Sequence, residues 1–366
     1  MKLVIQNTSR VWGGNEKWLA NLAAGLIDRG HEVVVSCRPG IVSQELLERG
    51  IRTSSFRPRG PIDFVSGLAF AAWLGRHRPD TLLLTSWRVT PWAVLAARLA
   101  RVPRVVMRLG LVREFPRGTP KAVALQGVDA VIANSLEIRD TWKQSAPATL
   151  SDRVHVVLNA VTSRSDERRA LTTQLRDELG LGPETVLIGG AGHVAKRKGF
   201  DVLLRSFGSM KEPDVALAIA GDGEHRSALE EEAVALGLSS RVFWLGHRAD
   251  GAGVIAGLDL FVLSSHNEGM ANVMLEAMAG GCPVIAFDVS GVRKALGEGE
   301  GRPPAGWTVP AGDEEALASA MDEVTRAVRS GSPVVAERAR EAHWRAVNWF
   351  SLERMVEECE RIIFPR

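Results

Sequence analysis

The chain has 366 residues, of which 45% are hydrophobic and 24% charged, and its formal net charge is only +2. This length suits two domains, and the composition is that of an ordinary globular protein with a sizeable core. Tyrosine is absent, which excludes chemistry that needs a phenol, and the three cysteines, Cys37, Cys282 and Cys359, show no CxxC spacing. We therefore expect neither a disulfide framework nor a zinc site, and we expect the protein to work in a reducing compartment.

The N-terminal segment has no signature of export. Its only early apolar run, residues 3–5, is far shorter than the core of a secretion signal. The most apolar stretches, 64–74 and 92–100, are well short of the roughly 20 residues that span a bilayer. We expect a cytoplasmic protein, with any contact at the inner face of the cell membrane being peripheral.

The first half of the chain alternates short apolar runs with helical patterns. Residues 3–5 predict a buried strand, the glycine pair at 13–14 a turn, and residues 16–29 an amphipathic helix that ends at Gly30. Further strands of this series are expected at 32–36, 81–85, 104–108, 130–133 and 154–158. Such alternation predicts parallel strands joined by crossover helices.

A second series follows the polar segment 162–183, which we interpret as a linker. Its strands are expected at 185–189, 215–220, 241–245, 260–263 and 283–286, and the last stretch, 332–366, has a helical pattern. The predicted fold class is therefore α/β, with two Rossmann-like parallel-sheet domains whose strand ends face a central cleft. We expect an N-terminal domain over 1–163 and a C-terminal domain over 164–344.

The strongest local signal lies at residues 264–289, SSHNEGMANVMLEAMAGGCPVIAFDV. A predicted strand ends just before it, Glu268 and Gly269 lie in a polar loop, and a helix is expected to begin near Asn272 and to carry Glu276. A helix N-terminus suits a phosphate, and carboxylates on either side suit sugar hydroxyls. The alternative is that Glu268 only caps the helix and that Glu276 is a surface residue.

The segment EGMANVMLEAMAGGCPVIA resembles the E-x7-E signature of the retaining glycosyltransferases of family 4, which have the two-domain GT-B fold. The resemblance implies that Glu268 is catalytic and meets the transferred sugar, while Glu276 holds the ribose. The donor-binding residues that it implies in this segment are Gly269, Met270, Ala271, Asn272, Val273 and Glu276.

Other segments resemble the same family in the expected order. They are GGNEKWLANLAAGLIDRGHEV, VDAVIANS, RVHVVLNAV, GAGHVAKRKG, GDG, RVFWLGHRAD and NWFSLERMVEECERII. The last implies a C-terminal helix, at about 345–366, that crosses back to the first domain. The additional donor-binding residues implied by these segments are Gly14, Asn15, Gly192, His193, Lys196, Gly221, Gly223 and His247.

The basic loop Lys196-Arg197-Lys198-Gly199 follows a predicted strand. Fixed cations there would stabilise the charge that develops on a leaving diphosphate. Relatives usually place arginine directly after the glycine at the start of this loop, but this chain has His193. We therefore assign Lys198 and Arg197 to catalysis, with Lys196 as a second choice; the alternative is a solvated basic turn.

Many relatives also carry a histidine after the fourth strand of the first domain, but residues 101–114 contain none. Arg108 is the nearest polar side chain and is expected either to bind the sugar or a phosphate, as a catalytic residue, or to pair with Glu114. No DxD or HExxH pattern stands out, so we expect no metal and no cofactor.

The resemblance implies a retaining glycosyltransferase that moves a sugar from a nucleoside diphosphate sugar to a glycan, lipid-linked or small-molecule acceptor. A UDP-sugar donor and a role in lipopolysaccharide or polysaccharide biosynthesis are the expectation, although the residues do not separate UDP from GDP or ADP. A nucleotide-sugar binding protein, an epimerase and a phosphorylase stay open as alternatives. No nucleic-acid partner is expected.

The small net charge conceals an uneven distribution. Residues 1–165 contain 23 Lys and Arg against 12 Asp and Glu, whereas the rest of the chain is acidic. The resemblance implies that the N-terminal domain binds the acceptor and the C-terminal domain the nucleotide-sugar donor. A basic acceptor domain favours an anionic partner, either the lipid headgroups of a membrane or an acidic acceptor. The alternative is a general preference for arginine in this chain.

Overall fold

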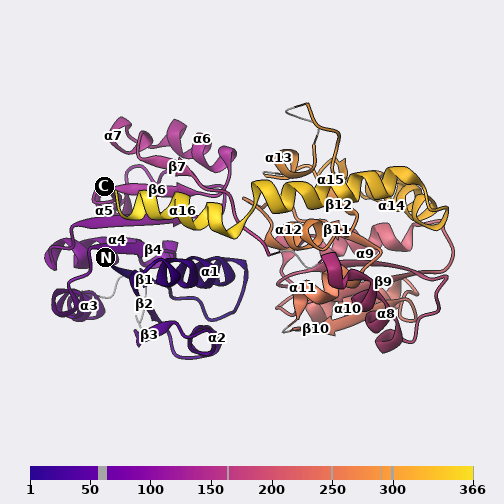
Figure 1. Ribbon diagram of the computed structural model, residues 1–366, viewed down its shortest axis with the longest axis horizontal. Helices are drawn as coiled ribbons and strands as arrows, with labels where there is room; N and C mark the ends of the chain where they lie inside the picture. Colours follow the sequence, from indigo (N-terminus) through magenta and orange to yellow (C-terminus); the bar gives the residue numbers. More distant parts are fainter. Residues whose placement is uncertain (57–63, 163–164, 249, 290, 298–300, 366) are drawn as a thin grey trace. The chain divides into compact units, whose positions relative to one another are not determined.

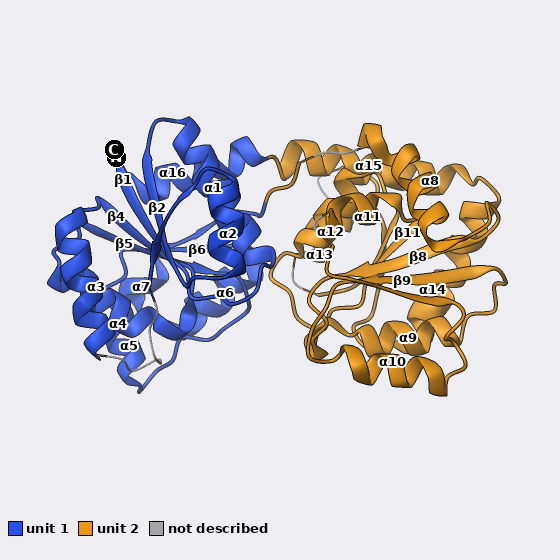
Figure 2. Ribbon diagram, turned by 90° about the horizontal axis from the view of Figure 1, so that it is seen from below, with its two compact units in different colours: residues 1–159, 352–366 blue, residues 160–351 orange. Residues whose placement is uncertain are grey.

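The computed structural model describes residues 1–366 except 57–63, 163–164, 249, 290, 298–300 and 366. It consists of two compact units (Figure 2): unit 1 comprises residues 1–159 and 352–366, and unit 2 comprises residues 160–351. In the part of the chain that the structure describes, no helix is both long and apolar enough to cross a lipid bilayer.

Unit 1 is built on a seven-stranded parallel sheet in the order β3-β2-β1-β4-β5-β6-β7 (Figure 1). Its strands are β1 (Lys2–Gln6), β2 (Glu32–Cys37), β3 (Arg52–Ser55), β4 (Thr81–Leu84), β5 (Arg104–Leu109), β6 (Ala130–Ala133) and β7 (Val154–Val156). The central strands are rich in Val, Ile and Leu, and these residues are buried. Continuous apolar runs of this kind are typical of parallel strands whose two faces are both covered by helices.

The helices of unit 1 occupy the crossovers between these strands. They are α1 (Gly14–Asp28), α2 (Ile41–Glu48), α3 (Phe64–His77), η1 (Trp87–Val89), α4 (Thr90–Leu99), α5 (Pro120–Leu125), α6 (Leu136–Ser145) and α7 (Ala148–Ser151). Local capping sets several starts: the Ser135 hydroxyl accepts from the Ile138 amide, and the Thr119 hydroxyl accepts from the Ala122 amide.

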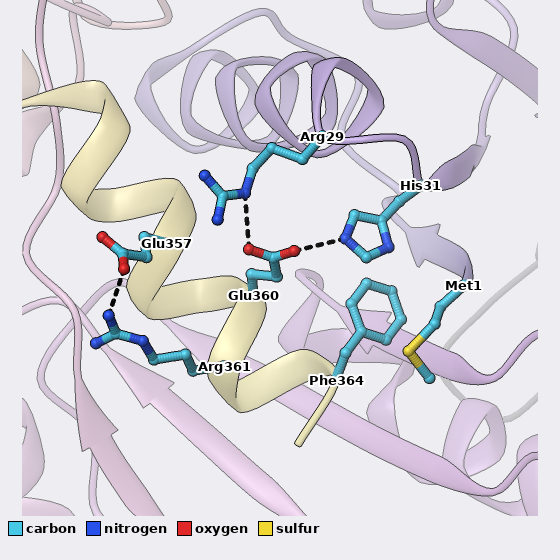
Figure 3. Close-up of a pocket in the computed structure, with 7 residues that line it drawn as sticks. All are labelled: Met1, Arg29, His31, Glu357, Glu360, Arg361 and Phe364. Carbon is cyan, nitrogen blue, oxygen red and sulfur yellow. Dashed lines mark hydrogen bonds and ion pairs between the residues drawn. The ribbon is translucent and has the colours of Figure 1, made fainter. Parts of the chain in front are cut away.

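The last helix, α16 (Leu352–Ile363), completes unit 1 although it comes from the far end of the chain. It packs against α1, where Gly25 leaves room for Val356. The Thr81 hydroxyl donates to the Ile363 carbonyl (2.9 Å), and Figure 3 shows Glu360 of the same helix reaching Arg29 and His31. The helical pattern at 332–366 is thus two helices, of which only α16 belongs to unit 1.

Unit 2 has a six-stranded parallel sheet in the order β10-β9-β8-β11-β12-β13. Its strands are β8 (Val186–Ala191), β9 (Val215–Ala220), β10 (Val242–Gly246), β11 (Leu260–Leu263), β12 (Val284–Phe287) and β13 (Trp307–Val309). Its helices are η2 (Ser165–Glu167), α8 (Arg168–Leu179), η3 (Lys196–Lys198), α9 (Phe200–Gly208), α10 (Arg226–Ala235), α11 (Gly251–Gly257), α12 (Asn272–Ala279), α13 (Val292–Leu296), α14 (Glu314–Arg329) and α15 (Pro333–Trp349).

The predicted fold class, α/β with two Rossmann-like parallel-sheet domains, is confirmed, and every predicted strand is present to within two residues.

The prediction that residues 162–183 form a linker is wrong for most of this segment. Residues 163–164 lie outside the described part, but α8 follows and packs on α11, with Leu175 buried. Its polar first turns concealed the helix. The short edge strands β3 and β13 were also missed, because neither has an apolar run.

In both sheets the chain winds outward in two directions from one central strand. The first strand of unit 1, β1, lies between β2 and β4, and the first strand of unit 2, β8, lies between β9 and β11. The loops at the carboxyl ends of such neighbours turn away from each other and leave a crevice, which is where ligands bind in open α/β sheets. Each unit therefore has one preferred binding edge.

Candidate active site

The centre of the candidate site in unit 2 is the pair of loops that follow β8 and β11. The Ser264 hydroxyl donates to the Lys198 carbonyl at 3.1 Å, and the His266 amide donates to the Arg197 carbonyl at 2.9 Å. These bonds join two segments that are about 70 residues apart in sequence. The basic loop and the E-x7-E segment therefore form one structure at the binding edge of the sheet.

The two loops also bring their charged side chains together. The Lys198 ammonium donates to Glu268 Oε1 in a close ion pair, and Arg197 Nη1 lies 3.3 Å from the same oxygen. The Lys198 and Glu268 side chains are only 11% and 9% exposed, whereas Arg197 is 44% exposed. A carboxylate and an ammonium that are both nearly buried depend on each other, since removing either one leaves an uncompensated charge.

Glycines allow the backbone of this edge to come together. Gly199 has φ of +62°, and a Cβ at this position would lie 2.1 Å from the Ser264 carbonyl oxygen. Gly221, after β9, has φ of +143°, and its Cβ would lie 1.8 Å from the Gly192 carbonyl oxygen. Only glycine fits at either position, so the loops after β8, β9 and β11 pack backbone against backbone.

Helix α12 begins at Asn272, as the sequence predicts, and its N-cap is Ala271. Since Ala271 is the N-cap and the Glu268 carboxylate accepts from Lys198 and Arg197, the interpretation of Glu268 as a simple cap is wrong. Gly269, Met270 and Ala271 are buried in the turn before the helix, and Val273 and Glu276 lie half-buried on its first turns.

The remaining candidates of unit 2 lie further out. His193 is exposed after β8, where its ring bonds the Asp222 carbonyl (2.9 Å) and pairs with Glu224 (2.9 Å). Lys196 is exposed as well. His247 is exposed after the edge strand β10, which two strands separate from β11. Gly192 and Gly223 are half-buried in the loops after β8 and β9.

At the binding edge of unit 1, Arg108 is a buried cation held by amide oxygens. Its Nη1 donates to Asn15 Oδ1 at 2.7 Å and its Nη2 to Asn159 Oδ1 at 3.1 Å, while the guanidinium lies 4.2 Å from the centre of the Trp18 ring. Burial lowers the pKa of Arg108 to about 10. The predicted alternative, a pair between Arg108 and Glu114, is wrong because the side chain points into this network.

The network continues to residues that the sequence analysis did not single out. Glu16 Oε1 accepts from Asn7 Nδ2 at 3.0 Å and from Asn15 Nδ2 at 2.9 Å, and Asn7 Nδ2 lies 3.1 Å from the Thr85 hydroxyl. Gly14 is the first residue of α1, directly before Asn15. Glu16 was detectable, since it follows the glycine pair in GGNE. Asn159 lies in RVHVVLNAV, a segment that resembles the family, whereas Asn7 carries no such local signal.

Comparison with known proteins places the chain in a family. Residues 183–340 match the family model described as "Glycosyl transferases group 1", and residues 12–164 match the model described as "Glycosyltransferase Family 4". Together the two models account for most of both units. The chain belongs to this family of GT-B glycosyltransferases, as its motifs predicted.

Individual relatives agree with this assignment. The lipopolysaccharide core biosynthesis glycosyltransferase LpsE of Rhizobium meliloti is 26% identical over 90% of both chains. The mannosyltransferase LpsB of the same organism is 30% identical over 59% of this chain and 58% of its own.

Solved structures share the fold at lower identity. HepE of Anabaena, crystallised with UDP and glucose, superposes with a TM-score of 0.83 at 21% identity, with both chains covered completely. WaaG, a glycosyltransferase of lipopolysaccharide biosynthesis, superposes with a TM-score of 0.74 at 16% identity, again over both chains in full.

Proposed function

We propose that this glycosyltransferase binds a nucleoside diphosphate sugar on unit 2 and transfers the sugar, with retention of its anomeric configuration, to an acceptor bound on unit 1. The observation that carries the proposal is the meeting of Lys198, Arg197 and Glu268 at one edge of the sheet. Two cations beside a carboxylate match a donor that has a diphosphate next to a sugar.

In the proposed reaction, the bond between the anomeric carbon and the diphosphate oxygen breaks, and a bond to the acceptor oxygen forms on the same face. The acceptor proton passes to the leaving diphosphate. Lys198 and Arg197 stabilise the charge that grows on the diphosphate, because cations already fixed in place need no reorganisation during the reaction. Glu268 faces the transferred sugar, and Glu276 holds the ribose. In unit 1, Arg108 binds the transferred sugar or its phosphate.

The test of this site is kinetic. Lys198→Ala should lower kcat by about 10²–10³, the usual cost of one stabilising charge, and Glu268→Gln should abolish turnover. Lys211→Ala, which changes an exposed lysine of the same unit, is the matched control and should behave as wild type. Near-normal turnover of Glu268→Gln would overturn the assignment, and a product with inverted configuration, observed by NMR, would overturn the mechanism.

We further propose that the reaction needs no metal ion. We assign Lys198 and Arg197, which lie beside Glu268, to stabilise the leaving diphosphate in place of a metal ion. Treatment with EDTA should leave the rate unchanged. Loss of activity that magnesium restores would contradict this part of the proposal.

For the substrates, we propose a UDP-sugar and a growing lipopolysaccharide or polysaccharide. The support is that HepE was crystallised with UDP and with UDP-glucose, and that LpsE and LpsB are named for lipopolysaccharide core biosynthesis. A thermal-shift screen should give a larger increase in Tm with UDP than with GDP or ADP at the same concentration. Equal shifts for all three would argue against a uridine preference.

Finally, we propose that unit 1 lies against the anionic inner face of the cell membrane. Val65 and Leu68 on α3 are 73% and 63% exposed, and Leu95 and Leu99 on the neighbouring α4 are 52% and 58% exposed. Exposed arginines lie at the ends of the same helices, with Arg76 in the last turn of α3, Arg78 directly after it and Arg101 after α4. Apolar side chains framed by cations suit a layer of anionic headgroups.

Flotation with vesicles tests this contact. Wild type should float with phosphatidylglycerol vesicles at low salt, and the double variant Val65→Ser/Leu68→Ser should not. Val234→Ser, at a site 67% exposed on α10, is the control and should float. Equal behaviour of wild type and double variant would overturn the membrane contact, and a dimer by light scattering that the double variant abolishes would assign this surface to self-association.

A further inference from the structure

In addition to Arg108, the binding edge of unit 1 carries a second group of cationic side chains. Trp87 lies in η1, directly after β4, and Arg113 lies in the loop after β5. Lys121 is on the first turn of α5. Because β4 and β5 are adjacent and parallel, the segments after both begin at the same edge of the sheet, where ligands bind.

Both cations converge on one indole ring. The Lys121 ammonium lies 3.6 Å from the centre of the Trp87 ring and donates to the Trp87 carbonyl at 2.6 Å. The Arg113 guanidinium lies 5.6 Å from the same ring centre. The position of the ring is itself fixed, since its centre is 6.0 Å from that of buried Trp142, edge to face. The cluster is thus held by packing.

In the part of the chain that the structure describes, no carboxylate neutralises this cluster. Among the described residues, no carboxylate lies within 4.0 Å of Lys121 or Arg113, although Glu114 is next in sequence to Arg113. Two other arginines of unit 1 do have carboxylate partners: Arg98 pairs with Asp129, and Arg139 with Asp140. Burial and the nearby Arg113 lower the pKa of Lys121 to about 8. Two cations held together with no carboxylate partner among the described side chains favour the binding of an anion.

We propose that Arg113 and Lys121, held together by the Trp87 indole ring, form an anion subsite that binds a phosphate or carboxylate group of the acceptor. The inference rests on the proposed function for the identity of the ligand as an acceptor. The same chemistry fits a phosphate of a lipid headgroup, so the experiment separates a soluble sugar phosphate from a lipid surface.

The experiment is calorimetric titration of the full chain with glucose 6-phosphate, in saturating UDP so that the cations of unit 2 are occupied. Wild type should bind glucose 6-phosphate at least tenfold more tightly than glucose. Lys121→Met should weaken the binding tenfold or more, and Arg113→Gln several-fold. Lys143→Met, at an exposed lysine of α6, should bind as wild type. Melting temperatures establish that the variants are folded.

Two further measurements complete the test. In the titration of wild type, the pKa of Lys121, followed by NMR of its side chain, should rise when glucose 6-phosphate binds. If glucose 6-phosphate fails to bind but phosphatidylglycerol vesicles bind wild type and not Lys121→Met, the anion is a lipid headgroup. Equal affinity of wild type and Lys121→Met for both probes would overturn the subsite. Failure of UDP to bind would count against the proposed function and not against the subsite.

Discussion

At the scale of single residues, the donor-binding edge of unit 2 depends on how closely its loops approach. The Lys198–Glu268 ion pair joins loops whose backbones touch at Gly199 and Ser264. The charges are therefore placed by backbone packing as well as by their own attraction. Steric changes at Gly199 should consequently affect both stability and catalysis.

The first prediction compares two glycines with almost the same backbone conformation. Gly199 and Gly180 have φ of +62° and +64°, but only at Gly199 would a Cβ meet other atoms. Gly180→Ala should cost about 1 kcal/mol, the penalty of the left-handed conformation alone. Gly199→Ala should cost roughly 3 kcal/mol or more and should reduce turnover. Urea unfolding measures both, and equal losses would contradict the steric argument.

At the scale of secondary-structure elements, the contact between α1 and α16 holds the end of the chain in unit 1. Four side chains of α16 are buried: Met355, Val356, Cys359 and Ile363. The helix packs on α1, where Val356 lies against Gly25, and the hydrogen bonds of Thr81 and Arg104 fix its end. This contact has a steric and an electrostatic component, and each can be tested.

The steric component is tested at Gly25. A Cβ there would lie 2.5 Å from Val356 Cγ2, so Gly25→Ala should destabilise the protein by about 1–3 kcal/mol. Val356→Ala should recover part of this loss in the double variant. Gly75→Ala on α3, where the space is open, is the control and should be neutral or stabilising by about 0.5–1 kcal/mol. Chemical denaturation gives the values; additive effects of the two changes would refute direct contact.

The electrostatic component is tested at Glu360 (Figure 3). Hydrogen bonds from His31 and Arg29, both at 2.7 Å, lower the pKa of Glu360 below its usual 4.5. A depressed carboxyl pKa stabilises the fold above the unfolded value, and this contribution is lost as the pH falls through the folded pKa. Glu360→Gln should therefore cost about 1 kcal/mol at pH 7, and its difference from wild type should shrink below about pH 4.5.

Unfolding free energies measured between pH 3 and pH 7 provide this comparison. Glu48→Gln, at an exposed position on α2 of the same unit, is the control and should show no such pH-dependent difference. A constant difference between Glu360→Gln and wild type over the whole range would mean that the carboxylate charge contributes nothing.

At the scale of the whole molecule, the chain leaves unit 1 at Asn159 and returns to it at Leu352. Unit 1 is therefore incomplete until the last residues are in place. Deleting residues 352–366 removes five buried apolar side chains, the four of α16 and Phe364, a loss of roughly 5 kcal/mol or more. Hydrogen exchange should show lower protection in β1, β4 and α1 with little change in the sheet of unit 2. Unchanged protection in unit 1 would contradict this dependence.

The elements themselves were largely predictable. Buried parallel strands such as β8 and β11 are continuous apolar runs, and their helices show periodic apolar residues, so a local pattern suffices. Polar or very short elements were not predictable in this way. Strand β3 has the sequence RTSS and depends on pairing with β2, and the first turns of α8 are polar although the helix packs on α11.

The sequence by itself determined which chemical groups the site contains: two glutamates with seven residues between them around a helix start, and a basic loop after a strand. Only the tertiary structure decided their partners. Glu268 meets Lys198 from 70 residues away, and Arg108 bonds Asn15 and Asn159, 93 and 51 residues away. Local patterns report the burial of one element at a time, whereas these contacts arise from the order of strands in each sheet, which brings the ends of β8 and β11, and of β1 and β5, to a common edge.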